Sequence, residues 1–563
     1  MGIVNMFPTA AGIVLAAACL SSVTAASACN NNSSSSSSNS TRAAVPSAVL
    51  PQGTIRGFRD ASCNSVFLGV PFAGTTGGGN RWRPPQDLPR SNRTFAATSY
   101  GPTCPQAISG DLFSQQGEDC LNLNIWAPST GGENLPVFVY MYGGAMVTGS
   151  SSNPHIQGSN FARKGVVYVN FNTRESVFAS PHSAELTEEA AGTAGTAGAA
   201  GAARGSQNFG ILDVEKALDW VRENIRAFGG DPEHVVFGGH SSGGVHVDHY
   251  LWNHPDSWLK GAVQMSANAV SGPAFAPVNE ALDAVAAEVG CPKAAEGGQL
   301  DCLREVDVYA FQTADFNSTS NTWFAPIVDN VTRHADYAAR LAAGQYASHV
   351  PLLTGTSDGE GTIFSLVYGA ENGDFGSWIN TFDADSAHVE DDVLLGAYNA
   401  SDFGSEALRS GAQYGDARFN CAVDYLLDLR SAVQDTWVYR FFGAYDNVVG
   451  VPGTAPTHGT EVSFFHGGNE CFASLANVTG AQQALADSIH DWFVRWIKDP
   501  AAGPVGWAKT SPDSSGALVK LGVPGDELSV IPGSRGEYNS RCQSVYRPAF
   551  PKYPVVQSVA GIL

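Results

Sequence analysis

The chain has 563 residues and a mass of 59.0 kDa, which is enough to bury a large hydrophobic core. Its 31 Lys and Arg residues against 53 Asp and Glu give a formal net charge of −22, so nucleic acid and anionic membranes are poor partners. Hydrophobic residues make up 43% of the chain, which is typical of a well-packed soluble protein and not of a disordered one.

The N-terminus has the pattern of a cleaved signal peptide. The apolar run 10–20 is followed by small residues suited to cleavage near Ala25 or Ala28. This run is too short to span a bilayer, and no later stretch is long enough, so we expect no stable membrane insertion. No Lys or Arg precedes Arg42, which departs from the usual pattern. We therefore predict a signal peptide over 1–28 and a low-complexity Ser/Asn arm over 29–45.

Two further features agree with secretion. Beyond the arm, glycosylation sequons occur at Asn92, Asn317, Asn330, Asn399 and Asn477. The chain has ten cysteines, of which Cys19 would leave with the signal peptide, and this number suits an oxidising compartment. Nine cysteines would remain, so at least one is unpaired unless a second chain is involved. We expect an extracellular protein that carries N-glycans, with an oligomeric state that the sequence leaves open.

From residue 46 onward, apolar runs alternate with amphipathic stretches. The spacing of apolar residues over 211–225 predicts a helix with one buried face, ended by Gly229 and Gly230. Continuous apolar runs predict central strands covered on both faces, at 137–141, 166–171, 235–237, 262–265 and 437–442. The alternation predicts an α/β fold with a large, mostly parallel, doubly wound sheet, whose ligands bind at the carboxyl ends of strands.

Two G-x-S-x-G motifs are candidates for a nucleophile elbow, and this pattern is expected by chance roughly 0.6 times in a chain of this composition. Ser241 lies in "GHSSG", between a strand and a helix start, where flanking glycines permit the strained turn that exposes a hydroxyl. Ser357 lies in "GTSDG", where Asp358 and Glu360 crowd any developing negative charge. We therefore predict that Ser241 is the nucleophile.

A serine nucleophile needs a histidine base and an acid that orients it. In α/β folds of this kind the chain order is Ser, then Asp or Glu, then His. Glu360 and His458 follow Ser241 in that order, with Asp358 and His466 as the second choice for acid and base. Tyr142-Gly143-Gly144-Ala145 follow a predicted strand, and their small side chains would let backbone N–H groups turn toward an oxyanion.

These motifs resemble those of the type-B carboxylesterase family, which includes cholinesterases, fungal lipases and secreted fungal esterases. The resemblance covers most of residues 50–545, and secreted fungal carboxylesterases are the members most alike in pattern. It rests on "FLGVPFA" at 67–73, "EDCLNLNIWAP" at 118–128, "YGGAMVTGS" at 142–150, "NIRAFGGDPEHVVFGGHSSGG" at 224–244, "GTSDGEGT" at 355–362 and "THGTEVSF" at 457–464.

The resemblance implies an α/β-hydrolase fold and a role for each motif. Residues 46–563 would form one α/β-hydrolase catalytic domain that needs no cofactor and no metal. The catalytic residues would be Ser241, Glu360 and His458. The oxyanion-hole amides would belong to Gly144, Ala145 and Ser242. Disulfides would join Cys104 to Cys120 and Cys291 to Cys302, and a third pairing, Cys421–Cys542, is the weakest of the implied set.

Several positions depart from the family pattern. His240 stands where the family usually has Glu, so a charged imidazole there could alter the pH profile. Ala145 replaces a commoner glycine, which puts tolerance for bulky tertiary alcohols in doubt. Only 15 residues lie between Cys104 and Cys120, without a Trp, so neither the lid of the lipases nor the aromatic residue that receives choline is expected.

Two other segments remain open. Residues 184–205 are rich in Ala, Gly and Thr and predict a surface insertion that borders the site. The histidines at 234, 240, 246, 249 and 254 crowd one region, but no carboxylate accompanies them at a recognised zinc spacing, so core or solvated histidines are favoured over a metal site.

The sequence thus predicts a secreted serine ester hydrolase that acts through an acyl-enzyme on small or aryl esters. A lipase or sterol esterase is one alternative, which activation at an interface would distinguish. A non-catalytic adhesion or binding protein on the same fold is the other, although such proteins typically lose the serine or the histidine.

Overall fold

The computed structural model describes residues 45–549 and 556–557, except 107–114, 130, 194–204, 270–273, 276–278, 318–323, 368, 371–372, 383–388, 449–452, 474 and 513–515. The predicted signal peptide and all but the last residue of the predicted arm lie outside the described residues. The second half of the predicted insertion, through residue 204, lies outside them as well.

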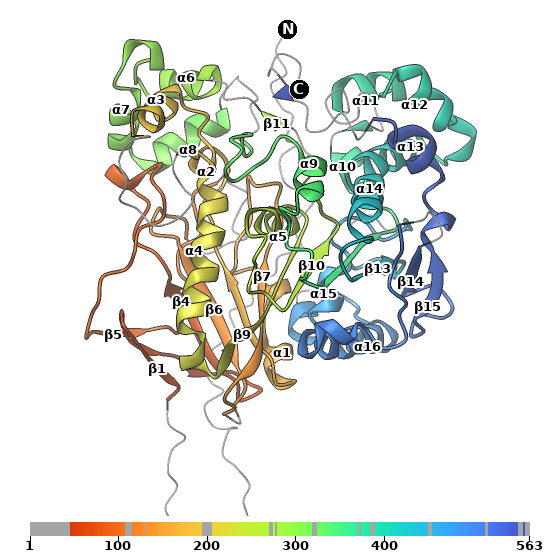
Figure 1. Ribbon diagram of the computed structural model, residues 1–563, viewed down its shortest axis with the longest axis horizontal. Coiled ribbons are helices and arrows are strands. Elements are labelled where there is room, and N and C mark those ends of the chain that lie inside the picture. Colours follow the sequence, from red (N-terminus) through yellow and green to blue (C-terminus); the bar gives the residue numbers. More distant parts are fainter. Residues whose placement is uncertain are drawn as a thin grey trace, which may run out of the picture.

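One large mixed sheet forms the centre of the molecule (Figure 1). Its strands are parallel from β14 to β8, and the pairs at the two edges are antiparallel. Within the described residues its eleven strands run in the order β15 (Ile531–Ser534), β14 (Ala517–Leu521), β13 (Thr436–Phe441), β12 (Leu352–Ser357), β10 (Gly261–Met265), β9 (Gly230–His240), β7 (Leu135–Met141), β8 (Val167–Phe171), β6 (Asn122–Ala127), β4 (Ser65–Pro71) and β3 (Phe58–Arg59).

Two small sheets accompany it. The first joins β1 (Ser47–Leu50), β2 (Gly53–Arg56) and β5 (Thr94–Ala96), and the second pairs β11 (Ala274–Phe275) with β16 (Val556–Gln557).

Helices connect the strands and cover the sheet. The α-helices are α1 (Ser159–Arg163), α2 (Ser176–Ala179), α3 (Ala184–Thr193), α4 (Phe209–Asn224), α5 (Ser242–Asn253), α6 (Asn279–Glu288), α7 (Gln299–Glu305), α8 (Val308–Asn317), α9 (Tyr337–Ala342), α10 (Thr362–Val367), α11 (Phe375–Phe382), α12 (Asp391–Ala397), α13 (Glu406–Gly415), α14 (Cys421–Arg430), α15 (Val462–Phe465) and α16 (Gly480–Lys498). Short 3-10 or π turns are η2 (Gly78–Asn80), η4 (Pro154–Ile156), η5 (Ile225–Phe228), η6 (Ala294–Glu296), η8 (Ala400–Asp402), η9 (Asp416–Asn420), η10 (Asn469–Phe472), η11 (Pro500–Ala502), η12 (Arg535–Glu537) and η13 (Cys542–Tyr546).

The aromatic contacts show that both faces of the sheet are covered. Phe138 of β7 packs its ring on Phe161 of α1 and Phe493 of α16. Phe237 of β9 lies beside Val139 and packs on Tyr250 of α5. Because successive strand side chains point to opposite faces, α1 and α16 cover one face and α5 covers the other.

The predicted central elements are present. The strands expected at 137–141, 166–171, 235–237, 262–265 and 437–442 correspond to β7, β8, β9, β10 and β13. The expected helix at 211–225 is α4, and its predicted apolar face is buried. The α-helix ends at Asn224, and η5 continues the chain to Gly229, whose φ of 88° provides the left-handed cap.

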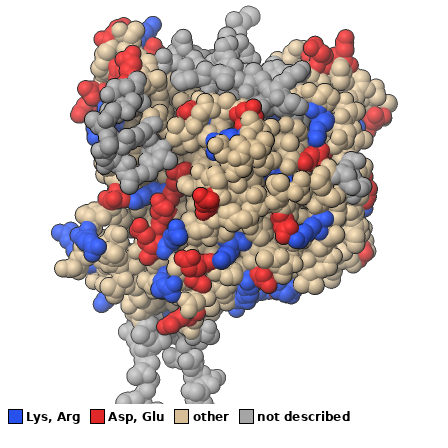
Figure 2. All heavy atoms as spheres, viewed as in Figure 1, with Lys and Arg blue, Asp and Glu red and all other residues tan. Residues whose placement is uncertain are grey.

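Two global features bear on partners. No helix of the described segments is long and apolar enough to cross a membrane. On the face seen in Figure 2, Lys and Arg side chains lie scattered among acidic ones. Neither positive nor negative side chains form a continuous patch on this face. A face with such mixed charges is poorly suited to bind a large charged partner.

Candidate active site

Ser241 occupies a strained turn between β9 and α5. Its backbone has φ 54° and ψ −129°, and its N–H donates to the carbonyl of Met265 over 2.9 Å. A non-glycine residue in such a conformation costs about 1–3 kcal/mol and persists only when its surroundings enforce it. The two neighbouring glycines permit the turn. A Cβ on Gly239 would come within 2.4 Å of Gly243, and one on Gly243 within 2.3 Å of the Met141 carbonyl oxygen.

Glu360 and His458 meet beyond the carboxyl ends of β12 and β13. His458 Nδ1 lies 2.5 Å from Glu360 Oε2. The other carboxyl oxygen accepts hydrogen bonds from the Ser266 hydroxyl at 2.5 Å and the Ser357 N–H at 2.6 Å. Glu360 is 1% exposed. These contacts fix the carboxyl group and, through it, the orientation of the imidazole.

The remaining nitrogen of His458, Nε2, is buried and has no hydrogen-bond partner among the described residues. No hydrogen bond joins it to the Ser241 hydroxyl in this part of the chain. The structure thus brings Glu360 and His458 together, while the contact between His458 and Ser241 stays open. Such contacts are often long in ligand-free enzymes and tighten when substrate binds.

Burial moves both members of this pair toward their neutral forms. It raises the pKa of Glu360 to about 7, against the opposing effect of the Ser266 and Ser357 hydrogen bonds. It also lowers the pKa of His458 to about 4. Two groups in such close contact titrate as a unit. Between these two values the pair therefore already carries one added proton, and a second arrives only when His458 is protonated.

Glu461 is a buried member of the site that the sequence analysis missed. Its carboxyl oxygens accept hydrogen bonds from the hydroxyls of Ser266, at 3.0 Å, and Ser357, at 2.8 Å. Ser266 thereby contacts both Glu360 and Glu461, yet a hydroxyl has only one hydrogen to donate. The network therefore has room for one additional proton on a carboxyl group. The only sequence signal was an acidic residue three positions after His458.

His240 packs directly against His458. Their ring centroids are 4.5 Å apart. Burial, and next the neighbouring His458, lower the pKa of His240 to about 3. Its imidazole is therefore neutral in the working range of pH. The expectation that a charged His240 could alter the local field is wrong in this respect, because the side chain is too deeply buried.

A pH profile tests this assignment. We expect kcat/KM to fall on the acid side as His458 takes up a proton, because burial lowers its pKa to about 4 and an imidazolium can no longer accept a proton from Ser241. His240 should add no separate step. In a His240→Glu variant the new carboxylate favours imidazolium at His458, so the acid limb should move up by roughly one pH unit.

The profile of kcat/KM against pH for both proteins is the measurement. An unmoved limb in the variant would show that position 240 does not act on His458. Loss of all turnover would show that His240 has a role beyond this electrostatic one.

The segment that follows β7 carries the predicted oxyanion residues. Gly144 has φ 149°, and a Cβ there would come within 1.8 Å of the Thr148 carbonyl oxygen. Ala145 and Met146 also have positive φ, 58° and 62°. Ser242 is the first residue of α5, so its N–H is one that a helix leaves without an intrahelical partner.

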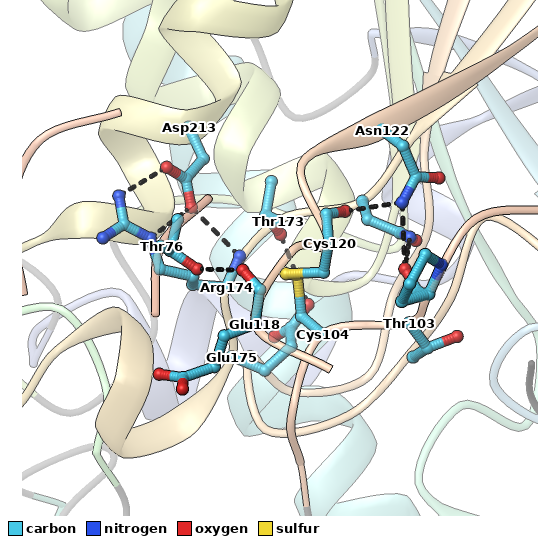
Figure 3. Close-up of a disulfide and its surroundings, with 12 residues drawn as sticks. Thr76, Thr103, Cys104, Glu118, Cys120, Asn122, Thr173, Arg174, Glu175 and Asp213 are labelled. Atoms are coloured by element: carbon cyan, nitrogen blue, oxygen red, sulfur yellow. Dashed lines mark hydrogen bonds and ion pairs between the residues drawn. A yellow bond between two sulfur atoms is a disulfide. The ribbon is translucent and has the colours of Figure 1, made fainter. Parts of the chain in front are cut away.

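Buried side chains of Gln106 and Glu175 accept hydrogen bonds from the segment that follows β7. Gln106 accepts hydrogen bonds from the Thr148 hydroxyl, at 2.5 Å, and the Gly149 N–H, at 2.8 Å. Glu175 accepts one from the Tyr142 hydroxyl at 2.9 Å. Gln106 lies two residues from Cys104, whose disulfide with Cys120 lies near Glu175 in Figure 3.

The second choices for acid and base have other partners. Asp358 forms an ion pair with Arg440 at 2.8 Å. His466 is fully buried, and its two ring nitrogens contact the Val462 carbonyl and the Tyr168 hydroxyl.

The histidines of α5 have the surroundings of core residues. His246 and His249 lie on α5 with ring centroids 6.5 Å apart, and both are buried. The described residues contain no group of three or more His, Cys, Asp or Glu that could hold a metal ion. Burial lowers the pKa of His246 to about 4, as for a core histidine.

The disulfides follow the expected pattern. Cys104–Cys120, Cys291–Cys302 and Cys421–Cys542 are all formed. Cys63 is disulfide-bonded as well, and Cys471 is a free, buried cysteine.

Comparisons with known proteins point to one family. A model described as "Carboxylesterase family" matches residues 44–526. Para-nitrobenzyl esterase from Bacillus subtilis is 32% identical over 311 residues, which cover 53% of this chain and 60% of the relative. Lipase 4 from Diutina rugosa is 32% identical over 372 residues, covering 58% and 64%. The aligned segments thus span less than two thirds of these relatives.

Two further similarities concern compartment and fold. A secreted lipase from Arthroderma benhamiae is 32% identical over 275 residues, covering 46% of each chain. A solved structure of a PNB esterase superposes with a TM-score of 0.71 at 23% identity, over 91% of this chain and 100% of that one. The fold is therefore that of these esterases.

Proposed function

The chain belongs to the carboxylesterase family, and we propose that it hydrolyses carboxylic esters with Ser241 as the nucleophile. The observation that carries this proposal is the strained Ser241 turn beside the buried Glu360–His458 pair. The ring of His240, the residue before Ser241, packs on His458 and so links the two halves of the site.

The mechanism follows from the groups present. Ser241 Oγ attacks the ester carbonyl carbon, and His458 Nε2 takes the proton that Oγ releases. The amides of Gly144, Ala145 and Ser242 stabilise the oxyanion. The intermediate then expels the alcohol, which receives its proton from His458. Water repeats the sequence on the acyl-enzyme and releases the acid. Glu360 orients the imidazole throughout and stabilises its positive charge.

We propose small or aryl esters as substrates. A lipase must cover a large apolar acyl-binding surface in the absence of lipid, and a long hinged lid does this. Here the Cys104–Cys120 disulfide closes a segment of only 16 positions. Gln106 within it accepts hydrogen bonds from Thr148 and Gly149, which follow the predicted oxyanion residues. A segment this short is poorly suited to act as a lid.

Kinetics on dissolved and emulsified esters test this proposal. The rate should follow the concentration of dissolved ester with no jump at the solubility limit, and short-chain and aryl esters should be turned over faster than triolein. Deletion of 194–204, which leaves helix α3 and its buried Leu186 in place, should change the preference for bulky esters modestly and leave small-ester turnover intact. A sharp rate increase on emulsified triolein that this deletion removes would favour the lipase alternative.

The lipase alternative has support of its own, because Lipase 4 and a secreted lipase are among the relatives. The non-catalytic alternative has less, since the serine, acid and histidine are all retained.

We further propose that the protein is secreted and glycosylated, with a signal peptide over 1–28, an arm over 29–45 and a catalytic domain over 46–563. The disulfides and the secreted lipase among the relatives support an oxidising compartment. The sequon residues Asn92, Asn330, Asn399 and Asn477 are exposed, as a glycan requires, whereas the side chain of Asn317 lies outside the described residues.

A further inference from the structure

Residues 142–149 form the oxyanion segment, and their backbone adopts a conformation that most residues avoid. Gly144, Ala145 and Met146 follow one another with φ values of 149°, 58° and 62°. Non-glycine residues with positive φ persist only where their surroundings enforce that conformation. The predicted oxyanion-hole amides of Gly144 and Ala145 lie within this run. The contacts that enforce the run therefore also set the direction of these amides.

Two hydrogen bonds connect the oxyanion segment to one dipeptide, Glu175-Ser176. At the start of the segment, the Tyr142 hydroxyl donates to Glu175 Oε1 over 2.9 Å. Where the run of positive φ ends, the Met146 carbonyl accepts from the Ser176 N–H over 2.8 Å. Ser176 itself has a positive φ of 50°, so the dipeptide is constrained as well. A displacement of Glu175 would therefore reach the run of positive φ from both sides.

The carboxyl group of Glu175 is buried without a cation. Glu175 is 2% exposed, and its Oε1 also accepts from the Thr173 hydroxyl at 3.3 Å. Arg174 pairs with Asp213 instead (Figure 3), and no cation of the described residues forms an ion pair with Glu175. Burying a carboxyl group without an opposite charge is costly, so an apolar side chain would fill this position at a lower cost. What an apolar side chain cannot supply is the hydrogen bond to Tyr142.

The surroundings favour the neutral form of this acid. Burial raises the pKa of Glu175 well above its ordinary value, against the hydrogen bonds from Tyr142 and Thr173, and the negative charge of Asp213 raises it further. A neutral acid places no fixed negative charge next to a segment whose amides must receive an oxyanion. A glutamine has the same shape and an oxygen that can accept both hydrogen bonds, so an amide should replace this acid well.

We propose that Glu175 is a positioning residue for the oxyanion hole. Through its hydrogen bond to Tyr142, and through the bond between Ser176 and Met146, it holds the amides of Gly144 and Ala145 in the direction that stabilises the transition state. Glu175 acts through the oxyanion segment and not on the substrate. This inference rests on the proposed ester hydrolase function and deepens it.

Two variants of Glu175 test this role. Glu175→Val fills the position but removes the acceptor, and it should lower kcat for p-nitrophenyl acetate about 10- to 100-fold, somewhat less than the roughly 100- to 1000-fold loss for removal of an oxyanion-hole donor. KM should change little, because the oxyanion forms in acylation and in deacylation and both steps slow together. Glu175→Gln keeps the acceptor and should retain at least about a third of kcat, by the isosteric argument above. Thermal unfolding of each variant checks that it folds.

Tyr142→Phe removes the donor of the same hydrogen bond and should lower kcat by a factor similar to that of Glu175→Val. The double variant should lose little more than either single one, because both changes break one interaction. If Glu175→Val does not fold, the comparison of Tyr142→Phe with its matched control decides.

Tyr346→Phe is that matched control. The Tyr346 hydroxyl donates a buried hydrogen bond of 3.0 Å to Gln434. Tyr346 precedes β12 and Gln434 precedes β13, so this bond lies at the edge of the sheet opposite the carboxyl ends of these strands. The variant loses a buried tyrosine hydrogen bond of nearly the same length and should leave kcat unchanged.

The outcomes separate this inference from the proposed function. Full kcat in Tyr142→Phe or in a folded Glu175→Val, additive losses in the double variant, or a rise in KM in place of a fall in kcat would overturn the inference alone. So would a loss in Glu175→Gln as large as that in Glu175→Val. If the unaltered protein hydrolyses no ester and takes no phosphonate label on Ser241, the proposed function is overturned, and this inference with it.

Discussion

Replacing Ser241 with alanine is expected to lower kcat for ester hydrolysis by about a million-fold. The same change should abolish covalent labelling by an organophosphonate. Ser241 alone combines the strained turn at the end of β9 with the start of α5 and a neighbour packed on His458. The measurements are steady-state hydrolysis of p-nitrophenyl acetate and peptide mapping of the phosphonate adduct.

Ser357→Ala is the matched control, since Ser357 lies in the second G-x-S-x-G motif. Its side chain is fully buried, and its hydroxyl donates to Glu461. The variant should keep the label on Ser241. Its rate should fall only modestly, because the hydrogen bond that it loses lies behind Glu360 and not at the reacting atoms. A label that maps to Ser357, or that persists without Ser241, would overturn the assignment.

Glu360→Gln is expected to lower kcat by about ten-thousand-fold with little change in KM. The amide keeps the shape of the carboxyl group but cannot stabilise an imidazolium. It can also turn its NH₂ toward His458 Nδ1, which favours the tautomer with the hydrogen on Nε2 and removes the acceptor that Ser241 needs. Because the amide has no charge to desolvate, the folded protein should tolerate it, and thermal unfolding would check this.

Asp358→Asn provides the comparison with the second-choice acid. Asp358 is half-buried and pairs with Arg440, so its loss should reduce kcat by less than tenfold, in keeping with the small energy of such ion pairs. A larger loss in Asp358→Asn than in Glu360→Gln would mean that the orienting acid has been misassigned.

The parts of the site that the sequence predicted are those that local backbone geometry specifies. Gly239 and Gly243 have no room for a side chain. The two glycines in the motif therefore indicate the strained turn at Ser241 from the sequence alone. Buried parallel strands are equally visible, because continuous apolar runs are needed when both faces are covered. The chain order of Ser241, Glu360 and His458 required the resemblance as well, since 119 and 98 positions separate them along the sequence.

What the sequence missed depends on contacts between distant segments. Glu461 joins the site through Ser266, which is 195 positions away. The protonation of His240 could not be predicted either, because it depends on burial by segments far along the chain. Neither a motif nor a periodicity reports how much water reaches a side chain.

The Cys421–Cys542 disulfide, which joins α14 to η13, affects the unfolded chain more than the folded one. It closes a loop of 121 positions, and a covalent loop of about 100 residues removes chain entropy from the unfolded ensemble equivalent to about 4–5 kcal/mol. That amount is comparable with the whole net stability of many domains, roughly 5–15 kcal/mol. The same polypeptide would therefore be much less stable in a reducing cytosol, and its folding yield should depend on where in the cell the chain is made.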